Sequence, residues 1–175
     1  MVLHLEHIWE SEKLEVGKNF NNIVRKLIKR REEEEWRDQM EKKPKLRLYR
    51  KLKSRLVLEN YVLDIERENR RYLTMLRGGT NYLRIERGRW VGESEGERVC
   101  NVCLCNEVED EKHFLLTCPM YVSERVEMFR RIREDCELEH AEDMNEDWQM
   151  NILIGIGWRK SEYIRKAFEI KKRYT

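Results

Sequence analysis

Proline and glycine are scarce in this chain, and their scarcity limits the folds that it can adopt. Among 175 residues there are two prolines, Pro44 and Pro119, and eight glycines. Folds rich in β-strands need many tight turns, and those turns depend on such residues. The composition therefore argues against a β-sandwich or barrel, and we expect a mainly α-helical protein built as a helical bundle.

The sequence also lacks a long apolar segment. Its most apolar window, residues 152–158, is far shorter than the roughly 18 residues that cross a bilayer. Residues 1–6 contain no basic cluster followed by an apolar run, as a secretory signal would. We expect no membrane partner and an intracellular protein, nuclear or cytoplasmic and not secreted.

Charged residues are abundant and unevenly distributed. They make up 40% of the chain, yet the net charge is only +2. Residues 42–55 contain eight basic side chains and no acidic one, whereas residues 134–147 contain eight acidic side chains and no lysine or arginine. This segregation indicates a basic surface for a polyanion, or two faces of the protein that attract each other. Ordinary solvated helix faces are the alternative, and the pattern alone does not choose between them.

Three of the five cysteines form a metal-binding pattern with a histidine. Cys100, Cys103, His113 and Cys118 follow the spacing C-x2-C-x9-H-x4-C. Two cysteines at this spacing can reach one ion across a tight turn, and a following helix can supply the other two ligands. Zn²⁺ suits Cys3His ligation, and four protein ligands leave no position for water. We therefore predict one structural Zn²⁺, whose loss through Cys118→Ser would unfold only residues 98–120.

The cysteines have other interpretations. A redox C-x-x-C needs a βαβ context, but the residues after Cys103 are acidic and polar. Unrelated buried thiols are the second alternative. Cys105 is too close to Cys103 for joint coordination and is treated as a spare thiol, and Cys136 is treated as a semi-buried bystander. In a reducing compartment, an odd number of cysteines at metal spacing favours zinc over disulfides.

Apolar periodicity predicts a series of helices. They are expected over residues 21–43, 46–58, 64–77, 80–88, 111–116, 119–136 and 161–173. Pro44 would end the first helix, and Gly78-Gly79 would end the third in a left-handed conformation. Asp64 and Thr80 would act as N-caps. The expected segments are an N-terminal helical segment at 1–43, a basic helical region at 44–98, a zinc-knuckle module with its following helix at 99–136, and an acidic linker with a C-terminal helix at 137–175.

Three stretches of the sequence resemble one known family. They are LRGGTNYLRIERGRW at 76–90, ERVCNVC at 97–103 and VEDEKHFLLTCPMY at 108–121. They resemble the zinc-binding C-terminal tail of the reverse-transcriptase polyproteins of non-LTR retrotransposons. That tail carries an LR-G-L-E-GRW stretch and a Cys-Cys-His-Cys knuckle with an E-HFLL-CP-Y core. The resemblance covers roughly residues 46–130, including similar helices at 46–53 and 59–61.

The resemblance implies a nucleic-acid-binding tail without the catalytic part of the polyprotein. The family's polymerase needs a Tyr/Phe-x-Asp-Asp carboxylate pair, and this chain contains no Asp-Asp. No endonuclease set of Asp, His and Asn is visible. We therefore expect that the chain is not an enzyme and has no small-molecule substrate. It could be a fragment of such a polyprotein, a decayed copy of it, or the product of a host gene derived from it. Cys105 stands where the family usually has a small or polar residue.

In that family the knuckle region is thought to grip template RNA or target DNA. RNA or DNA is therefore the expected partner, with a polymerase-bearing protein as a second. Carried over by position, the zinc ligands would be Cys100, Cys103, His113 and Cys118. The basic residues expected to contact phosphate are Lys51, Lys53, Arg55, Arg84, Arg87 and Arg89. Trp90 and Tyr82 are candidates for stacking on an unpaired base, unless Tyr82 is a core residue and Trp90 caps the small core.

A protein-interaction adapter is the alternative function. The acidic residues 134–147 and the apolar residues 148–158 would dock a protein partner. The nearly balanced net charge favours this alternative, because dedicated nucleic-acid binders are usually more basic.

Overall fold

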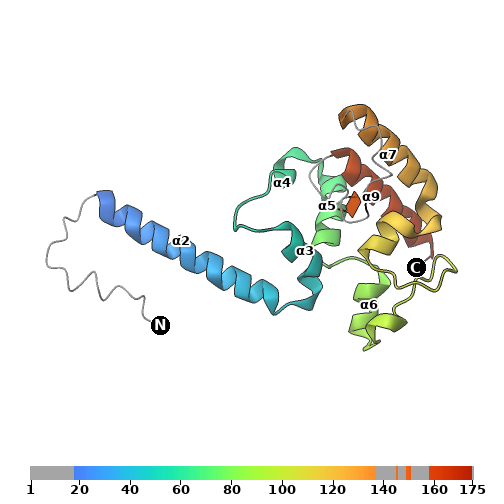
Figure 1. Ribbon diagram of the computed structural model, residues 1–175, viewed down its shortest axis with the longest axis horizontal. Helices are drawn as coiled ribbons and strands as arrows, with labels where there is room; N and C mark the ends of the chain where they lie inside the picture. Colours follow the sequence, from blue (N-terminus) through green and yellow to red (C-terminus); the bar gives the residue numbers. More distant parts are fainter. Residues whose placement is uncertain (1–17, 137–144, 146–148, 151–157, 175) are drawn as a thin grey trace. The chain divides into compact units, whose positions relative to one another are not determined.

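Helices joined by loops make up the part of the chain that the computed structural model describes, with no strand among these residues (Figure 1). The described residues are 18–136, 145, 149–150 and 158–174. They fall into two compact units, one ending at Lys42 and one beginning at Lys43. The prediction of a mainly α-helical fold with a Cys-Cys-His-Cys knuckle between helices is confirmed.

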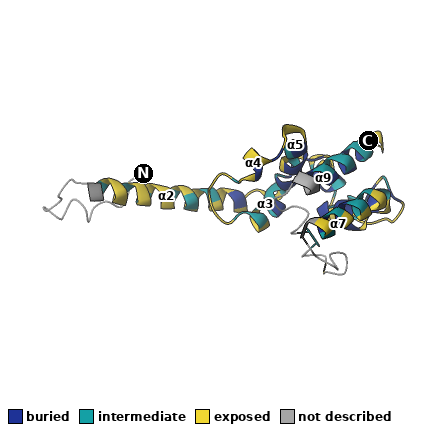
Figure 2. Ribbon diagram, turned by 90° about the horizontal axis from the view of Figure 1, so that it is seen from above, coloured by how far each residue is buried: buried dark blue, intermediate teal, exposed yellow. Residues whose placement is uncertain are grey.

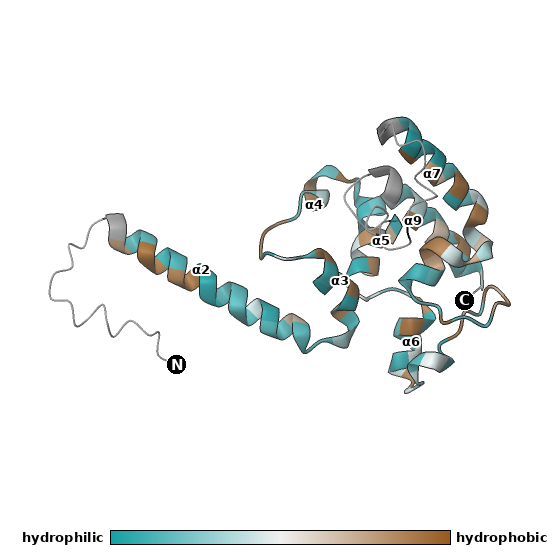
Figure 3. Cartoon of the chain, viewed as in Figure 1, coloured by the Kyte–Doolittle hydropathy of each residue, from teal (hydrophilic) through white to brown (hydrophobic). Residues whose placement is uncertain are grey.

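The first unit is represented by a single helix, α2, Lys18–Glu41. Apolar side chains lie in its N-terminal half and charged ones fill the rest, as the hydropathy colours show (Figure 3). Ion pairs at i,i+4 spacing run along its surface, for example Arg30–Glu34 at 3.2 Å and Arg31–Glu35 at 3.1 Å. The helix predicted over 21–43 is confirmed, and Pro44 opens the next element instead of continuing this one.

The second unit contains all other described elements. In chain order they are a 3-10 turn Pro44–Leu46, α3 Arg47–Leu52, α4 Tyr61–Asp64, α5 Arg67–Arg77, α6 Arg84–Trp90, a 3-10 turn Glu95–Glu97, a π-helical turn His113–Thr117, a 3-10 turn Pro119–Tyr121, α7 Val122–Cys136, α9 Trp158–Lys171 and a 3-10 turn Lys172–Tyr174. Helices α5 and α7 both pack against α9. The C-terminal helix therefore lies at the centre of this unit although it is formed last in the sequence.

One apolar core joins the helices to the knuckle. Phe168 of α9 stacks on Tyr72 of α5 at 5.6 Å between ring centroids, and Phe114 lies 4.7 Å from Phe168. Cys100, Cys103 and Cys118 belong to the same cluster of buried side chains. The buried segments of α5 and α9 are visible inside the second unit, whereas α2 is largely exposed (Figure 2).

The helix predicted over 46–58 is too long. Helix α3 ends at Leu52, and the backbone N–H of Lys53 closes the last turn on the carbonyl of Tyr49. The Lys53 ammonium then donates to the carbonyl of Val57 at 2.6 Å. This bond stabilises a loop instead of a further helical turn, and Leu56 is exposed in that loop.

Asp64 is not the N-cap of the next helix. It ends the short helix α4, Ile65 follows in an extended conformation, and Glu66 is the N-cap of α5. The predicted end of α5 is confirmed, because Gly79 adopts a left-handed φ of +60°. A Cβ atom at this position would lie 2.0 Å from the backbone oxygen of Lys45, so close approach of a second segment also requires glycine.

The prediction that Thr80 begins and Gly88 ends the fourth helix is wrong. Helix α6 begins at Arg84, whose backbone N–H donates to the carboxylate of Glu109 at 2.8 Å. Glu109, which lies between Cys103 and His113 in the sequence, thus pairs a backbone N–H group that the helix itself leaves without a partner. The helix continues through Gly88, where a Cβ atom would lie 2.5 Å from Cγ of Arg98. The absence of a Cβ atom at Gly88 leaves room for the Arg98 side chain to pack against the helix, and the glycine does not end the helix.

The last two helices lie close to the predicted ranges. Spacing in the sequence predicts one apolar face of Val122, Val126, Phe129 and Ile132 on the first of them, α7. Phe129 and Ile132 are buried, but Val122 and Val126 are 53% and 60% exposed, so half of this prediction is wrong. On α9 the same spacing argument predicts a buried face of Tyr163, Ile164, Ala167 and Phe168, and all four are buried. Expectations for 1–17, for the Cys136 side chain and for most of 137–157 lie outside the described residues.

No helix in the described part of the chain combines the length and the apolar character needed to cross a membrane.

Candidate metal centre

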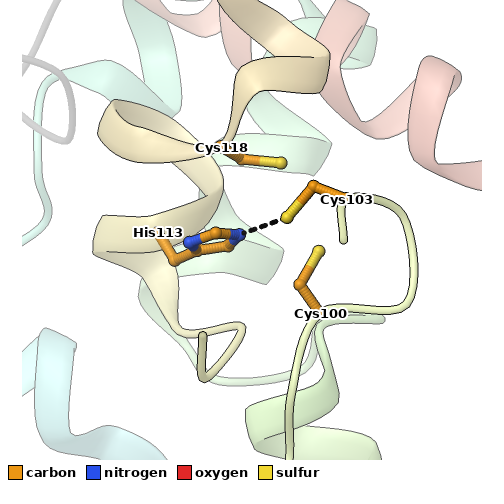
Figure 4. A group of neighbouring side chains, drawn as sticks. All are labelled: Cys100, Cys103, His113 and Cys118. Carbon is orange, nitrogen blue, oxygen red and sulfur yellow. Dashed lines mark hydrogen bonds between the residues drawn. The ribbon is translucent and has the colours of Figure 1, made fainter. Parts of the chain in front are cut away.

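Four side chains converge in the second unit as the sequence predicted. The ligand atoms of Cys100, Cys103, His113 and Cys118 all lie within 4.8 Å of one another, and all four residues are buried. The two first cysteines come from one loop, and the other two residues come from the π-helical turn and its end (Figure 4). These four donors could hold a metal ion.

A short hairpin presents the two loop cysteines. The backbone N–H of Cys100 donates to the carbonyl of Glu107 at 2.8 Å, and the N–H of Glu109 donates to the carbonyl of Arg98 at 2.9 Å. Asn106 supplies the left-handed residue of the turn, with φ 55°. These bonds hold the loop in a tight reversal, so both thiols face the same side.

The π-helical turn brings His113 and Cys118 together. The backbone N–H of Cys118 donates to the carbonyl of His113 at 2.7 Å, an i→i+5 bond. In an α-helix of about 3.6 residues per turn, residues five apart point in different directions. The wider turn reduces that difference, and such turns are frequent at functional sites.

A carboxylate orients the histidine ring. Nδ1 of His113 lies 2.8 Å from Oε2 of Glu107 and 3.2 Å from Oγ1 of Thr117. Nε2 lies 3.3 Å from Sγ of Cys103. A proton on Nδ1 therefore binds the carboxylate, and the Nε2 lone pair faces the thiols. A carboxylate behind a metal-ligating histidine has this arrangement.

The protonation of the cluster follows from its burial and its internal hydrogen bonds. Burial raises the pKa of the Cys118 thiol to about 12. The hydrogen bond with Cys100 raises the pKa of His113, and Glu107 adds to this effect. Burial opposes ionisation of Cys103, but the backbone N–H of Cys105 helps to lower its pKa overall. A bound cation must displace the Cys118 proton, since the thiolate is the ligand.

The size of the cluster fits a tetrahedral metal ion. Metal–sulfur bonds of about 2.3 Å and metal–nitrogen bonds of about 2.0–2.1 Å would place tetrahedral donors roughly 3.6–3.8 Å apart. The observed donors lie within 4.8 Å of one another, so a small contraction completes the site. Cys105 is exposed and lies outside the group, as expected for a spare thiol.

A buried ion pair ties the knuckle to α9. Glu109 is completely buried, and its Oε1 accepts from Nζ of Lys171 at 2.5 Å and lies 3.4 Å from Sγ of Cys100. Its backbone carbonyl accepts from the N–H of Ile85 on α6 at 3.1 Å. This pair is not evident in the sequence, because its members are 62 residues apart. The sequence carries no clear signal for this pair, because Lys171 opens the basic run Lys171-Lys172-Arg173 and does not stand out from it.

A second buried network involves a residue of the basic stretch 42–55. Arg47 donates to Glu86 and to Glu111, each at 2.6 Å, and Arg89 donates to Glu86 at the same distance. Burial raises the pKa of Glu111 although Arg47 favours its charged form. The charge of Arg47 is therefore engaged by two buried carboxylates, although 31% of its side chain stays exposed.

Some of the residues predicted to contact phosphate form ion pairs within the protein. Arg84 pairs with Glu93, Arg89 with Glu86, and Lys53 lies 3.8 Å from Glu59. The remaining three, Lys51, Arg55 and Arg87, are exposed.

The two candidate stacking residues are exposed. Trp90 is 70% exposed and Tyr82 is 38% exposed. The alternative that Tyr82 is a core residue is therefore wrong, and most of the surface of Trp90 is not buried as a cap on the small core. Trp90 shares the seven-residue helix α6 with Arg84, Arg87 and Arg89.

The comparisons with known proteins give no match. A scan against protein-family models, a search of curated proteins and a search of solved structures each found no match. The resemblance to a retrotransposon tail therefore stays a prediction.

Proposed function

We propose that the second unit is a zinc-stabilised nucleic-acid-binding module without catalytic activity of its own, related to the tail of a retroelement reverse transcriptase. The observation that carries this proposal is the attachment of α6 to a buried Cys3His cluster. RNA or DNA is the proposed partner, and a polymerase-bearing protein would supply the catalysis that this chain lacks.

Zinc is the proposed metal because of the donor set. Three thiols and one imidazole suit a borderline-soft cation that tolerates tetrahedral geometry, and zinc has no redox chemistry of its own. With four protein donors, the ion would have no open position for water or substrate. Its role would be to hold the loop of Cys100 and Cys103 against the turn of His113 and Cys118.

The cluster supports a surface that could meet a nucleic acid. Glu109 accepts from the backbone N–H groups of Arg84 and Ile85. Arg98 donates to the carbonyl of Ile85 at 3.0 Å and to the carbonyl of Glu93 at 2.7 Å. Helix α6 is thereby fixed at both its start and its end to the segments that flank the metal ligands.

Helix α6 offers an aromatic ring beside cationic groups. Trp90 and Arg87 are exposed, and exposed aromatic rings next to arginines can stack on unpaired bases and attract phosphates. Arg84 and Arg89 are held by Glu93 and Glu86, so phosphate would have to compete for them. We therefore assign the larger share of binding to Arg87 and Trp90.

Fluorescence anisotropy of labelled single-stranded RNA and DNA tests this function. Binding should weaken steeply with salt and show little sequence preference. Trp90→Ala should cost about 1–3 kcal/mol of binding free energy. Tyr174→Ala is the matched control, because Tyr174 is also an exposed aromatic residue but lies at the end of the C-terminal 3-10 turn.

The metal content of the purified protein should be measured before the binding titrations. Mass spectrometry should find about one zinc per chain, and Cys100→Ser should lose it. Absence of binding at about 50 mM salt, or binding that does not respond to salt, would overturn the proposal. A protein that co-purifies and survives nuclease treatment would favour the interaction adapter.

A further inference from the structure

A groove with a basic lining runs along α5, apart from α6 and the metal centre. Its volume is about 680 Å³. Its polar lining consists of Arg67, Glu68, Arg70, Arg71, Thr74 and Thr80. The lining contains three arginines and one carboxylate, so the groove favours an anion.

Two of these arginines differ from most others in the second unit. Arg47, Arg84 and Arg125 donate to carboxylates or carbonyl groups of the protein. Within the described part of the chain, the side chains of Arg67 and Arg71 form no ion pair or hydrogen bond, and both are exposed. Their guanidinium groups remain available for a ligand.

The arginines are arranged along one rigid helix. Arg67, Arg71 and Thr74 are spaced i, i+4, i+7, so they share one side of α5. Its opposite side contains the buried residues Leu73 and Leu76, and α5 packs against α9. The groove therefore has a fixed wall.

The start of α5 adds a further attraction for anions. The N-cap residue Glu66 makes no side-chain hydrogen bond to the first turn, so its orphan N–H groups are not capped in this way. Arg67 lies in that turn, and the positive end of the helix dipole acts there in the same direction as the arginines. Arg70 is fixed separately, because it donates to the carbonyl of Val62.

We propose that this groove binds phosphate groups of a nucleic acid backbone. The proposal rests on the nucleic-acid-binding function proposed above and adds a second contact site to it. Arg67 and Arg71 would each donate to phosphate oxygens through the planar guanidinium fork. The hydroxyl groups of Thr74 and Thr80 would add neutral donors.

The backbone is the favoured ligand because the groove has no platform for a base. No aromatic side chain is among its lining residues. Stacking on bases would instead occur at Trp90 and Tyr82, which are exposed elsewhere in the unit. The groove would thus contribute affinity without sequence preference.

The double variant Arg67→Gln/Arg71→Gln tests the groove. The matched control is Arg25→Gln/Arg37→Gln on α2, which removes the same charge from two exposed arginines. Anisotropy titrations with a labelled single-stranded oligonucleotide would be repeated over a range of salt concentrations. For single strands each phosphate contact contributes about 0.7 to the slope of log K against log salt. The groove variant should therefore lower the slope by about 1.4, and the control should leave it unchanged.

Each outcome has a distinct meaning. Circular dichroism and zinc content should match the unaltered protein for both variants, since all four arginines are exposed. A groove variant that binds like the control overturns the groove while leaving the proposed function intact. Equal losses in both variants also overturn it, because they indicate a response to net charge alone. If the unaltered protein does not bind nucleic acid, the proposed function fails and the groove proposal fails with it.

Discussion

The two units use the same charged residue types in opposite ways. On α2, Arg30 pairs with Glu34 four residues away, and both side chains are largely exposed. In the second unit, Lys171 pairs with Glu109 across 62 residues, and both side chains are almost fully buried. The ion pairs of α2 act within one helix, whereas the second unit has, besides such local pairs, buried pairs that join elements distant in sequence.

This difference determines what each unit depends on. An exposed pair of this kind contributes about 0.3–0.5 kcal/mol to its helix and is screened by salt. Burying two charges costs several kcal/mol per ion, which only good geometry and further hydrogen bonds offset. Helix α2 is therefore stabilised by several weak ion pairs, and loss of any one of them has little effect. The second unit depends on a few buried pairs, and loss of one partner from such a pair is strongly destabilising.

Removal of the proposed zinc should have the largest effect of all, and it should affect the second unit but not α2. Structural zinc contributes on the order of 10–16 kcal/mol in zinc-finger peptides, as much as a typical domain's net stability of about 5–15 kcal/mol. Cys118 lies in the same core as Phe114 and Phe168. We therefore expect chelation or Cys118→Ser to disorder the packing of the whole second unit, beyond the 98–120 expected from the sequence, while α2 stays helical.

Hydrogen exchange followed residue by residue measures this effect. Protection should fall in α5 and α9 as well as in the knuckle. Cys105→Ser is the matched control, because this thiol is exposed and lies outside the cluster, and it should leave both zinc content and protection unchanged. Protection that persists in α5 and α9 after chelation would mean that the knuckle unfolds alone.

Breaking the buried pair should have the next largest effect. Lys171→Met leaves the Glu109 carboxylate buried without its ammonium partner, and breaking such a pair costs about 3–5 kcal/mol. Urea unfolding of the zinc-loaded protein measures the change. Lys166→Met removes an exposed partner of Glu162 and should cost less than about 1 kcal/mol.

A double variant tests whether the unpaired, buried carboxylate of Glu109 causes the stability loss in Lys171→Met. Lys171→Met/Glu109→Gln removes the buried negative charge as well, so it should recover part of the stability lost in the single variant. If the single variant lies within about 1 kcal/mol of the unaltered protein, the pair does not join the knuckle to α9 energetically.

Zinc affinity should fall as the pH falls. Burial raises the pKa of Cys118 to about 12, so this thiol holds a proton at neutral pH that zinc must displace. The hydrogen bond with Cys100 and the nearby Glu107 raise the pKa of His113. Once the pH falls below this raised pKa the imidazole is protonated, and zinc must displace a second proton. Each displaced proton changes the apparent affinity about tenfold per pH unit.

Competition with a chelating dye between pH 7.5 and 6 measures this dependence. A peptide of residues 18–41 provides the reference, because it contains no histidine or cysteine that would titrate in this range. Its circular dichroism signal should stay constant while the zinc affinity of the full chain decreases. An affinity that does not change with pH would contradict displacement of the Cys118 proton.

The smallest expected effect lies on α2. Arg30→Gln removes one exposed i,i+4 pair and should reduce the stability of the helix by less than about 0.5 kcal/mol. Helicity measured on a peptide of residues 18–41 gives this value. The difference from Arg37→Gln, for whose side chain no pair is found among the described residues, should disappear at about 1 M salt.

The metal cluster was predictable because its signal is local. Cys100 and Cys103 lie in one hairpin, and His113 and Cys118 in one turn, so their spacing nearly fixes their geometry. Helix α2 was predictable for the same reason, since its stabilising pairs are four residues apart. The buried face of α9 was also correct, because its apolar stripe at helical spacing packs against α5 and α7.

Other features depended on partners far along the chain. The start of α6 is set by Glu109, and the early end of α3 follows from a loop that bonds back to Lys53. The capping preference of Thr80 was outweighed by the contact of Glu109 with the start of α6. Nothing in the structure explains why Glu66 and not Asp64 is the N-cap of α5. Local propensities amount to about 1 kcal/mol, so a buried charge or a packed side chain overrides them.

The sequence by itself determined a helical protein with one Cys-Cys-His-Cys cluster, because periodicity and short spacings act within a few residues. Only the tertiary structure decided which charges are available. It pairs Arg47 with buried carboxylates, places Lys171 inside the protein, and leaves Arg67, Arg71 and Arg87 exposed. The physical reason is that the cost of burying a charge depends on a partner that can be 62 residues away, and residue type alone does not identify that partner.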